Sequence, residues 1–257
     1  MSRADFLALP PRSSKPRSAG LSHVLDKAMP LPLLEIYLNH CGEFVDIIKM
    51  GWGLGYFDRD VAARAALCSQ HQVMLGTGGT FLEFAARQGR TEQFHAWALS
   101  QGVQAIEVSN GLGLMTRDRK HELVETFAQD FTVYAETGSK DGNAKAVPVE
   151  WADEMACDLA AGASQVIAEG RESGTVGLYQ GDGTIRANII DALAARIDPA
   201  LIIFEAPQKS QQSWLIEHLG ANVNLGNLEL TGVASVESLR LGLRADTATA
   251  VLNGQLP

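Results

Sequence analysis

Four glutamates stand at equivalent positions in the sequence, each directly after a short apolar run. They are Glu107, Glu136, Glu169 and Glu205, and the runs before them read AI, VYA, VIA and LIIF. Apolar runs that end in charge are typical of buried strands in a parallel α/β fold, whose carboxyl ends open at one mouth. Clustered carboxylates there suit a hard divalent cation such as Mg²⁺. One glutamate alone would indicate an internal salt bridge, but four at equivalent positions favour a site.

Cationic side chains recur at or just past the same strand ends. At that place an ammonium or guanidinium group can bind phosphate or carboxylate, and a lysine can also act as a general acid. Ion pairing, for example between Arg171 and Glu172, is the alternative. The candidates are Lys27, Lys49, Lys140, Arg171 and Lys209.

Two glycine-containing stretches could bind an anion through backbone N–H groups. GTGGT at 76–80 precedes a helix that Thr80 and Glu83 are expected to open as a capping box, although a tight turn explains its glycines more simply. NLGNL at 224–228 follows the expected eighth strand, where barrels often bind phosphate. It is therefore the better candidate for a phosphate site.

Strands alternate with helices along the whole chain, which predicts parallel pairing in βα units. Eight such units in 257 residues favour a single-domain (β/α)₈ TIM barrel over residues 21–257. Strands are predicted at 21–28, 44–51, 72–79, 104–109, 131–137, 165–169, 201–205 and 222–225. Helices are predicted at 31–41, 58–70, 80–100, 117–129, 148–161, 184–196, 209–218 and 232–243.

The alternation of side chains along a barrel strand decides which of these groups face inward. Apolar residues should face the helices, which sends their polar neighbours into the barrel. This assigns Lys49, Glu107, Glu136, Glu169, Glu205 and Asn224 to the interior near one end. Burying so many charges is unfavourable unless they are paired or bind a metal, so a purely structural role is disfavoured.

Composition narrows the class of protein. The chain is 46% hydrophobic and 20% charged, as in ordinary globular domains, and its net charge of −9 argues against nucleic acid as a partner. No apolar run has the length of a membrane span or a signal peptide, so no membrane partner is expected. Cys41, Cys68 and Cys157 are interpreted as small buried residues in a reducing compartment, and the predicted location is the cytoplasm.

Residues 1–20 are rich in Pro, Arg and Ser, and they are predicted to form a flexible basic arm. An alternative function for this arm is a flap near an anionic substrate, with Lys15 and Arg17 as the contacting residues. An acidic, helix-coated barrel often self-associates, so a homo-oligomer is also considered, although no interface motif stands out in the sequence.

Taken together, these motifs resemble the phosphosulfolactate synthase family. The resemblance runs from about residue 15 to 247 and includes FVDIIKMGWGLG, GTGGTFLEFAARQG, AIEVSNG, AGASQVIAEGRESG, IIFEAPQKSQQ, NVNLGNL and SLRLGLRADT. It implies a Mg²⁺-dependent (β/α)₈ barrel that adds sulfite to phosphoenolpyruvate to give (2R)-phospho-3-sulfolactate. The chain departs from the family pattern at Thr137, Thr77 and Gly170, and none of these departures removes a charged group.

The resemblance also implies roles for particular residues. A lysine would protonate C2 of the adduct after sulfite attacks the methylene carbon, and Lys140 is the first choice. The implied metal ligands are Glu107, Glu136 and Glu169, and the implied catalytic residues are Lys140, Lys49 and Glu172. The implied substrate-binding residues are Lys27, Lys49, Arg171, Ser109, Asn110, Asn224, Gly226 and Asn227.

Two other functions remain open at this level. A related lyase could use the same Mg²⁺ site on another enolpyruvate-like or sulfonated substrate. A non-catalytic member of the family could act in stress tolerance, because the family includes plant heat-stress relatives. The intact charged positions argue against the second.

Overall fold

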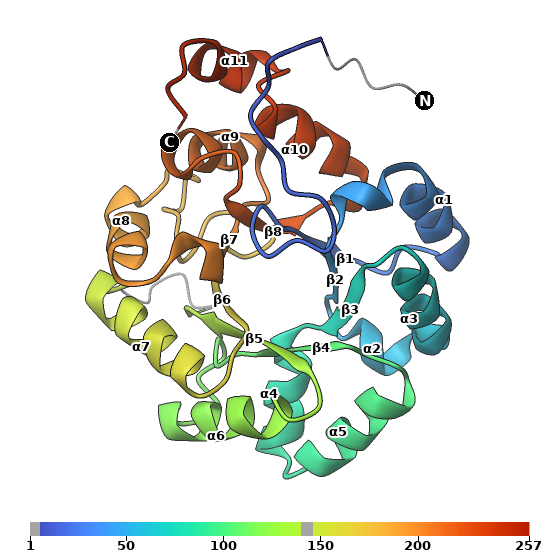
Figure 1. Cartoon of the computed structure of the whole chain (residues 1–257). Coiled ribbons are helices and arrows are strands. Elements are labelled where there is room, and N and C mark those ends of the chain that lie inside the picture. The colour runs from blue at the N-terminus through green and yellow to red at the C-terminus, as the bar shows by residue number, and fades with distance from the viewer. Residues whose placement is uncertain (1–5, 140–145, 257) are drawn as a thin grey trace.

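The computed structural model describes residues 6–139 and 146–256, and within them eight parallel strands close into a barrel in sequence order. Figure 1 shows the helices arranged around the outside of the strands. The predicted TIM barrel is therefore confirmed. The strands are β1 (Ser22–Asp26), β2 (Ile47–Met50), β3 (Met74–Thr77), β4 (Ala105–Val108), β5 (Thr132–Thr137), β6 (Gln165–Ala168), β7 (Ile202–Glu205) and β8 (Asn224–Leu228).

The helices mostly fall where the sequence places them. They are α1 (Leu31–Cys41), α2 (Leu54–Phe57), α3 (Val61–Gln70), α4 (Gly79–Arg87), α5 (Thr91–Ser100), α6 (Arg117–Phe127), α7 (Pro148–Ala160), α8 (Ala187–Arg196), α9 (Lys209–Leu219), α10 (Val233–Arg240) and α11 (Ala245–Leu252). The short helix α2 and the final helix α11 are not predicted from the sequence. In the part of the chain described, no helix is both long and apolar enough to cross a membrane.

The stretch expected to form one helix at 80–100 is two helices, and its capping box is wrong. The chain breaks between α4 and α5 at Gly89, whose φ of 66° is left-handed. Glu83 is fully buried, and its carboxylate accepts hydrogen bonds from the Ser109 hydroxyl and the Leu112 N–H instead of capping the helix. A tertiary contact has replaced the local one.

Side-chain alternation sorts the core into two layers, as the sequence predicts. Ile48, Ile106 and Phe204 belong to the large cluster between the barrel and its helices. A smaller cluster, which contains Ala105 and Ile203, fills the barrel interior. The charged residues Lys49, Glu107 and Glu205 are buried between these outward-facing neighbours. The barrel thus carries a charged layer above an apolar one.

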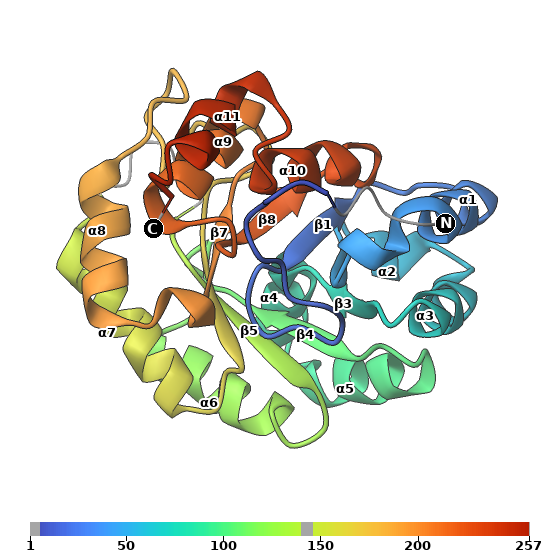
Figure 2. The ribbon, with the colours of Figure 1, turned by 45° about the horizontal axis from the view of Figure 1, so that its top comes forward.

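The N-terminal segment lies across the end of the barrel where the strands begin (Figures 1 and 2). Arg12 donates to Glu237 and to the Gly20 carbonyl, Lys15 donates to the carbonyls of His71 and Gln72, and Arg17 donates to the Glu43 carbonyl. The backbone contacts lie in the segments before β1, β2 and β3, and Glu237 lies near the end of α10, all away from the carboxyl ends of the strands. The idea of a basic flap over the substrate is therefore wrong for Lys15 and Arg17. From Pro11 onward the arm is hydrogen-bonded to the barrel, whereas Phe6 is 82% exposed.

Cysteine placement differs from expectation at one position. Cys41 and Cys68 are buried as predicted, whereas Cys157 is exposed on α7, and all three are free thiols. Burial raises the pKa of Cys68 to about 12, which makes it an inert packing residue.

Arg240 is buried completely at the same end of the barrel as the N-terminal segment. Its guanidinium donates to the carbonyls of Ala221, Val223 and Leu21, at 2.8, 2.5 and 3.0 Å. Burial, aided by Arg12, lowers its pKa to about 9. The side chain ties the start of β8 to the residue before β1, where the barrel closes.

We therefore expect Arg240→Met to lower the free energy of unfolding by about 3 kcal/mol, because three carbonyls each lose a buried charged donor. Arg196→Met is the matched control, since Arg196 is 62% exposed beside Asp153. That variant should stay within about 0.5 kcal/mol of the parent. Urea denaturation measures both, and equal stabilities for the two variants would contradict this role.

Candidate active site

A cavity of about 270 Å³ opens at the carboxyl ends of the strands. Four of its lining residues are the glutamates that follow apolar runs in the sequence, and they come from β4, β5, the end of β6 and β7. Each is between 1% and 4% exposed. A folded chain holds four carboxylates this close only when cations compensate their charge.

Lys49, on β2, supplies one such cation at the floor of the cavity. Its ammonium lies 2.9 Å from Glu107 Oε2, 2.9 Å from Glu205 Oε1 and 3.9 Å from Glu136 Oε2. Burial by itself disfavours the ammonium, but Glu107, then Glu205 and Glu136, outweigh that effect and hold the pKa of Lys49 well above its ordinary value. Lys49 is therefore a fixed positive charge at neutral pH.

His23 lies under this charged layer and is 2% exposed. Burial, followed by the nearby Lys49 ammonium, lowers its pKa to about 3, so the imidazole is neutral. It separates the charged residues from the apolar interior of the barrel.

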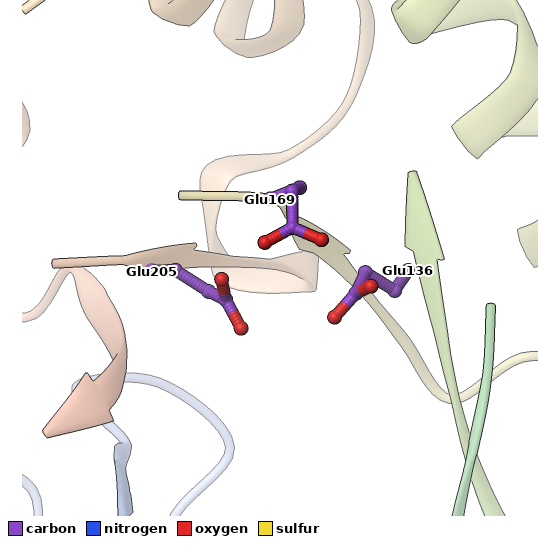
Figure 3. A group of neighbouring side chains, drawn as sticks. All are labelled: Glu136, Glu169 and Glu205. Atoms are coloured by element: carbon purple, nitrogen blue, oxygen red, sulfur yellow. The ribbon is translucent and has the colours of Figure 1, made fainter. Parts of the chain in front are cut away.

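Three of the glutamates form a compact group. One carboxylate oxygen from each of Glu136, Glu169 and Glu205 lies within 4.8 Å of the others, and Figure 3 shows the three side chains converging. Backbone groups orient two of them, since Gly170 N–H donates to Glu205 and Arg171 N–H donates to both Glu169 and Glu205. Three buried carboxylates with no nitrogen or sulfur donor suit a hard cation such as Mg²⁺.

Glu107, expected from the sequence as a ligand, has different partners. Its Oε1 accepts from the Gly79 N–H at the start of α4 at 2.7 Å, and its Oε2 faces the Lys49 ammonium. The geometry favours Glu205 in its place. The sequence signal for Glu205 was the same apolar run that identified the others, but spacing alone does not show which three carboxylates converge.

The segment after β6 holds the glutamates through its own fold. Tyr179 is buried and its hydroxyl donates to the Glu205 carbonyl, while Leu178 N–H donates to the Glu169 carbonyl. Gly177 adopts a φ of 63°, and a Cβ there would lie 2.0 Å from the Glu169 carbonyl oxygen. Glycine is required because the chain folds back against Glu169.

Several predicted residues do line the cavity. Arg171, Glu172 and Asn227 are part of its wall, with Arg171 half-buried and Glu172 exposed at the rim. Gly226 lies in β8 beside Glu205 and His23. Lys140 falls outside the described residues, so its role as proton donor stays a prediction. Trp52 and Phe81, which sequence reasoning did not select, complete the wall.

Other predicted residues have structural roles elsewhere. Asn224 opens β8 at the far end of the barrel, where its amide bonds the Leu21 N–H and the carbonyls of Ala200 and Ile202. Residues 224–228 are strand β8 itself and not a loop after it, because the strand is shifted from the expected 222–225.

Ser109, Asn110 and Lys27 also lie outside the cavity lining. Ser109 bonds Glu83, and the Asn110 amide bonds both backbone groups of Met115. Lys27 pairs with Glu229 at 2.9 Å, with its ammonium 5.7 Å from the Trp52 ring. Each polar group is used within the fold, and the assignment of these three residues to substrate binding stays a prediction.

The closed barrel with a charged cavity at its carboxyl end defines this protein as a TIM-barrel enzyme. Solved barrels of similar shape include 3-hexulose-6-phosphate synthase from Salmonella typhimurium, with 14% identity and a TM-score of 0.54 over 90% of this chain and 98% of that one. 3-Keto-L-gulonate-6-phosphate decarboxylase from Vibrio cholerae is 14% identical, with a TM-score of 0.54 over 92% of this chain and 99% of that one. At this identity the likeness shows the fold alone.

Sequence comparison defines the family. The family model described as (2R)-phospho-3-sulfolactate synthase (ComA) matches residues 10–246. Phosphosulfolactate synthase from Bacillus subtilis is 36% identical over 247 residues, 95% of this chain and 98% of the relative. The enzyme of that name from Methanocaldococcus jannaschii is 38% identical over 234 residues, which are 89% of this chain and 93% of the relative. The chain belongs to the phosphosulfolactate synthase family and is an enzyme of the lyase class.

We expect Gly177→Ala to destabilise the protein, because a methyl group at a left-handed φ would collide with the Glu169 carbonyl. The unfolding free energy should fall by at least about 1 kcal/mol, and the Leu178 amide should exchange faster with deuterium. Gly181→Ala is the control, since nothing lies within 4 Å of a Cβ there. If both variants kept parental stability and exchange, the segment would not constrain Glu169 as described.

Proposed function

We propose that the protein is a Mg²⁺-dependent phosphosulfolactate synthase, which joins sulfite to the methylene carbon of phosphoenolpyruvate and gives (2R)-phospho-3-sulfolactate. Family membership supports the product class. The observation that carries the proposal is the buried group of carboxylates around Lys49, which combines a place for a hard cation with a fixed ammonium. Both are needed where two anions must react with each other.

The donor set suits the metal, and Glu136, Glu169 and Glu205 are the residues that would hold it. When bound, Mg²⁺ would act as a Lewis acid toward the negative charge that develops on the substrate carboxylate. It would also balance the negative charge of the three buried side chains. Glu107 would serve a different purpose, holding the Lys49 ammonium and the start of α4 in place.

The cations would bring the two substrates together. Sulfite and phosphoenolpyruvate repel each other, so fixed positive charge in a buried cavity lowers the barrier and orients the reacting atoms. Lys49 offers such a charge at the floor, and Arg171 offers another in the wall. Both would bind substrate oxygens without needing to change protonation state.

The proton that reaches C2 must come from a different group. We propose Lys140, by sequence, as the donor, with Lys49 as the second choice. The raised pKa of Lys49 makes its ammonium a poor acid and favours a binding role for it. Glu172, the other catalytic residue that the family resemblance implies, is exposed at the rim and would act at the cavity entrance.

The partners follow from the same features. A cavity of about 270 Å³ suits small metabolites, and the net charge of −9 disfavours nucleic acid. We place the reaction in the cytoplasm, where three free thiols stay reduced.

The direct test is incubation of the purified protein with phosphoenolpyruvate, sulfite and Mg²⁺, followed by ³¹P NMR. A new phosphate-ester signal should appear, should not form when a chelator is present from the start, and should form once excess Mg²⁺ is added. Formation only with a different enolpyruvate-like acceptor would indicate a related lyase. No product from folded protein with any such acceptor would refute the synthase.

We further expect Lys49→Met to lower kcat/KM by at least about 100-fold, because two buried carboxylates lose their counter-charge and the substrates lose an anchor. Lys49→Arg keeps the positive charge and should retain the fold. Its activity therefore shows how far the shape of the lysine side chain matters apart from its charge. Lys209→Met is the control, since Lys209, a candidate cation from the sequence, does not line the cavity, is 51% exposed and pairs with Asp246. Near-parental turnover by folded Lys49→Met would remove Lys49 from the mechanism.

A further inference from the structure

Between two paired positions, β8 contains one residue more than the adjacent strand β1. Ser22 pairs with Leu225 and Val24 pairs with Leu228, so two steps along β1 face three steps along β8. Such a β-bulge turns a side chain away from the direction that regular alternation would give it. The extra residue falls at Gly226–Asn227.

The bulge decides where Asn227 points. Leu225 and Leu228 both pack in the outer core, between the barrel and its helices. Regular alternation would send Asn227, two residues after Leu225, to that same outer face. Instead Asn227 has a left-handed φ of 52° and is one of the residues that line the active-site cavity. A strained backbone conformation beside an active site is a reason to look for a function.

The side-chain amide of Asn227 has an unused hydrogen-bonding group that a ligand could satisfy. The residue is 5% exposed, and its Oδ1 is buried without a hydrogen-bond partner. Buried amides are normally bonded, and Asn224 on the same strand bonds three backbone groups. Because rotation about χ2 exchanges the two amide atoms, the group can present an N–H donor to a bound molecule.

Charge divides the cavity wall into two halves. Among the described residues that line it, every carboxylate comes from β4, β5 and β7 or from the segment after β6. The other half, from β8 through β3, contributes Leu25, Lys49, the glycines after β2 and β3, and Asn227. The nearby Glu229 is paired with Lys27 outside this wall. An anion is repelled less in the half without carboxylates.

The start of α4 lies where the two halves meet, because the Glu107 carboxylate already accepts the Gly79 N–H. Gly78, Gly79 and Thr80 line the cavity at the N-terminus of a nine-residue helix, whose dipole favours negative charge. The phosphate carries most of the charge of an enolpyruvate ester, so it should occupy the half without carboxylates while the carboxyl group faces the metal.

We propose that Asn227, turned inward by the bulge, donates its amide N–H to the phosphate oxygens of the substrate and fixes which way the substrate lies. This rests on the proposed function only for the identity of the phosphate ester; a phosphate subsite at Asn227 stands independently of the reaction. The residue acts in binding and positioning, and the bond-forming steps belong to the carboxylates and lysines.

The test uses Asn227→Gly, in which glycine keeps the left-handed φ and removes only the amide. Binding of inorganic phosphate, measured by calorimetry, should weaken by about tenfold or more. The KM for phosphoenolpyruvate should rise by a similar factor while the KM for sulfite stays unchanged. Asn227→Asp, equally tolerant of this φ, should weaken phosphate binding further because it adds a negative charge. Asn188→Ala, on the exposed face of α8, is the control.

Each outcome decides the proposal. An increase in the KM for sulfite with phosphate binding unchanged would assign Asn227 to sulfite and overturn it. Unchanged phosphate binding and unchanged KM values in Asn227→Gly would also overturn it, as would a parent protein that binds neither inorganic phosphate nor phosphoenolpyruvate. If the parent makes no phosphosulfolactate but Asn227→Gly still weakens phosphate binding, the proposed function fails and the subsite stands.

Discussion

The ammonium of Lys49 between Glu107 and Glu205 is the contact on which the rest of the site depends. Four carboxylates are almost completely buried at one end of the barrel, and mutual repulsion would force protons onto them if no cation were present. One ammonium offsets only part of that charge. The remaining excess, to which Glu136, Glu169 and Glu205 contribute, is the charge that would attract the proposed divalent cation. The same charges that are costly for folding are those that the proposed chemistry requires.

The scaffold holds these charges through strands and tight backbone contacts. Parallel strands place their carboxyl ends around one cavity, and the segment after β6 fastens Glu169 and Glu205 through the N–H groups of Gly170 and Arg171 and the Tyr179 hydroxyl. At the opposite end Arg240 and the N-terminal segment close the barrel. Stability and chemistry are thus built at different ends of the same strands.

Much of this arrangement follows from the sequence because it depends on local patterns. The βα rhythm predicts the barrel, and alternation around Ile48, Ile106 and Phe204 correctly turns Lys49, Glu107 and Glu205 inward. Features that depend on contacts between residues far apart in the sequence cannot be predicted in this way. Glu83 bonds Ser109 instead of capping its own helix, and the bulge in β8 reverses Asn227 while the shifted strand leaves Asn224 at the far end. The sequence identified Asn227 as a substrate-binding candidate, but as part of a loop and not as a bulged strand residue.

Magnesium titration by calorimetry tests the central claim most directly, with the parent compared against Glu205→Gln and Glu107→Gln. We predict one Mg²⁺ per chain, an affinity at least about tenfold weaker in Glu205→Gln, and a smaller loss in Glu107→Gln, whose carboxylate serves Lys49 and Gly79. Failure of the folded parent to bind Mg²⁺, or a loss in Glu107→Gln equal to or greater than that in Glu205→Gln, would contradict the assignment of Glu136, Glu169 and Glu205 as the metal site.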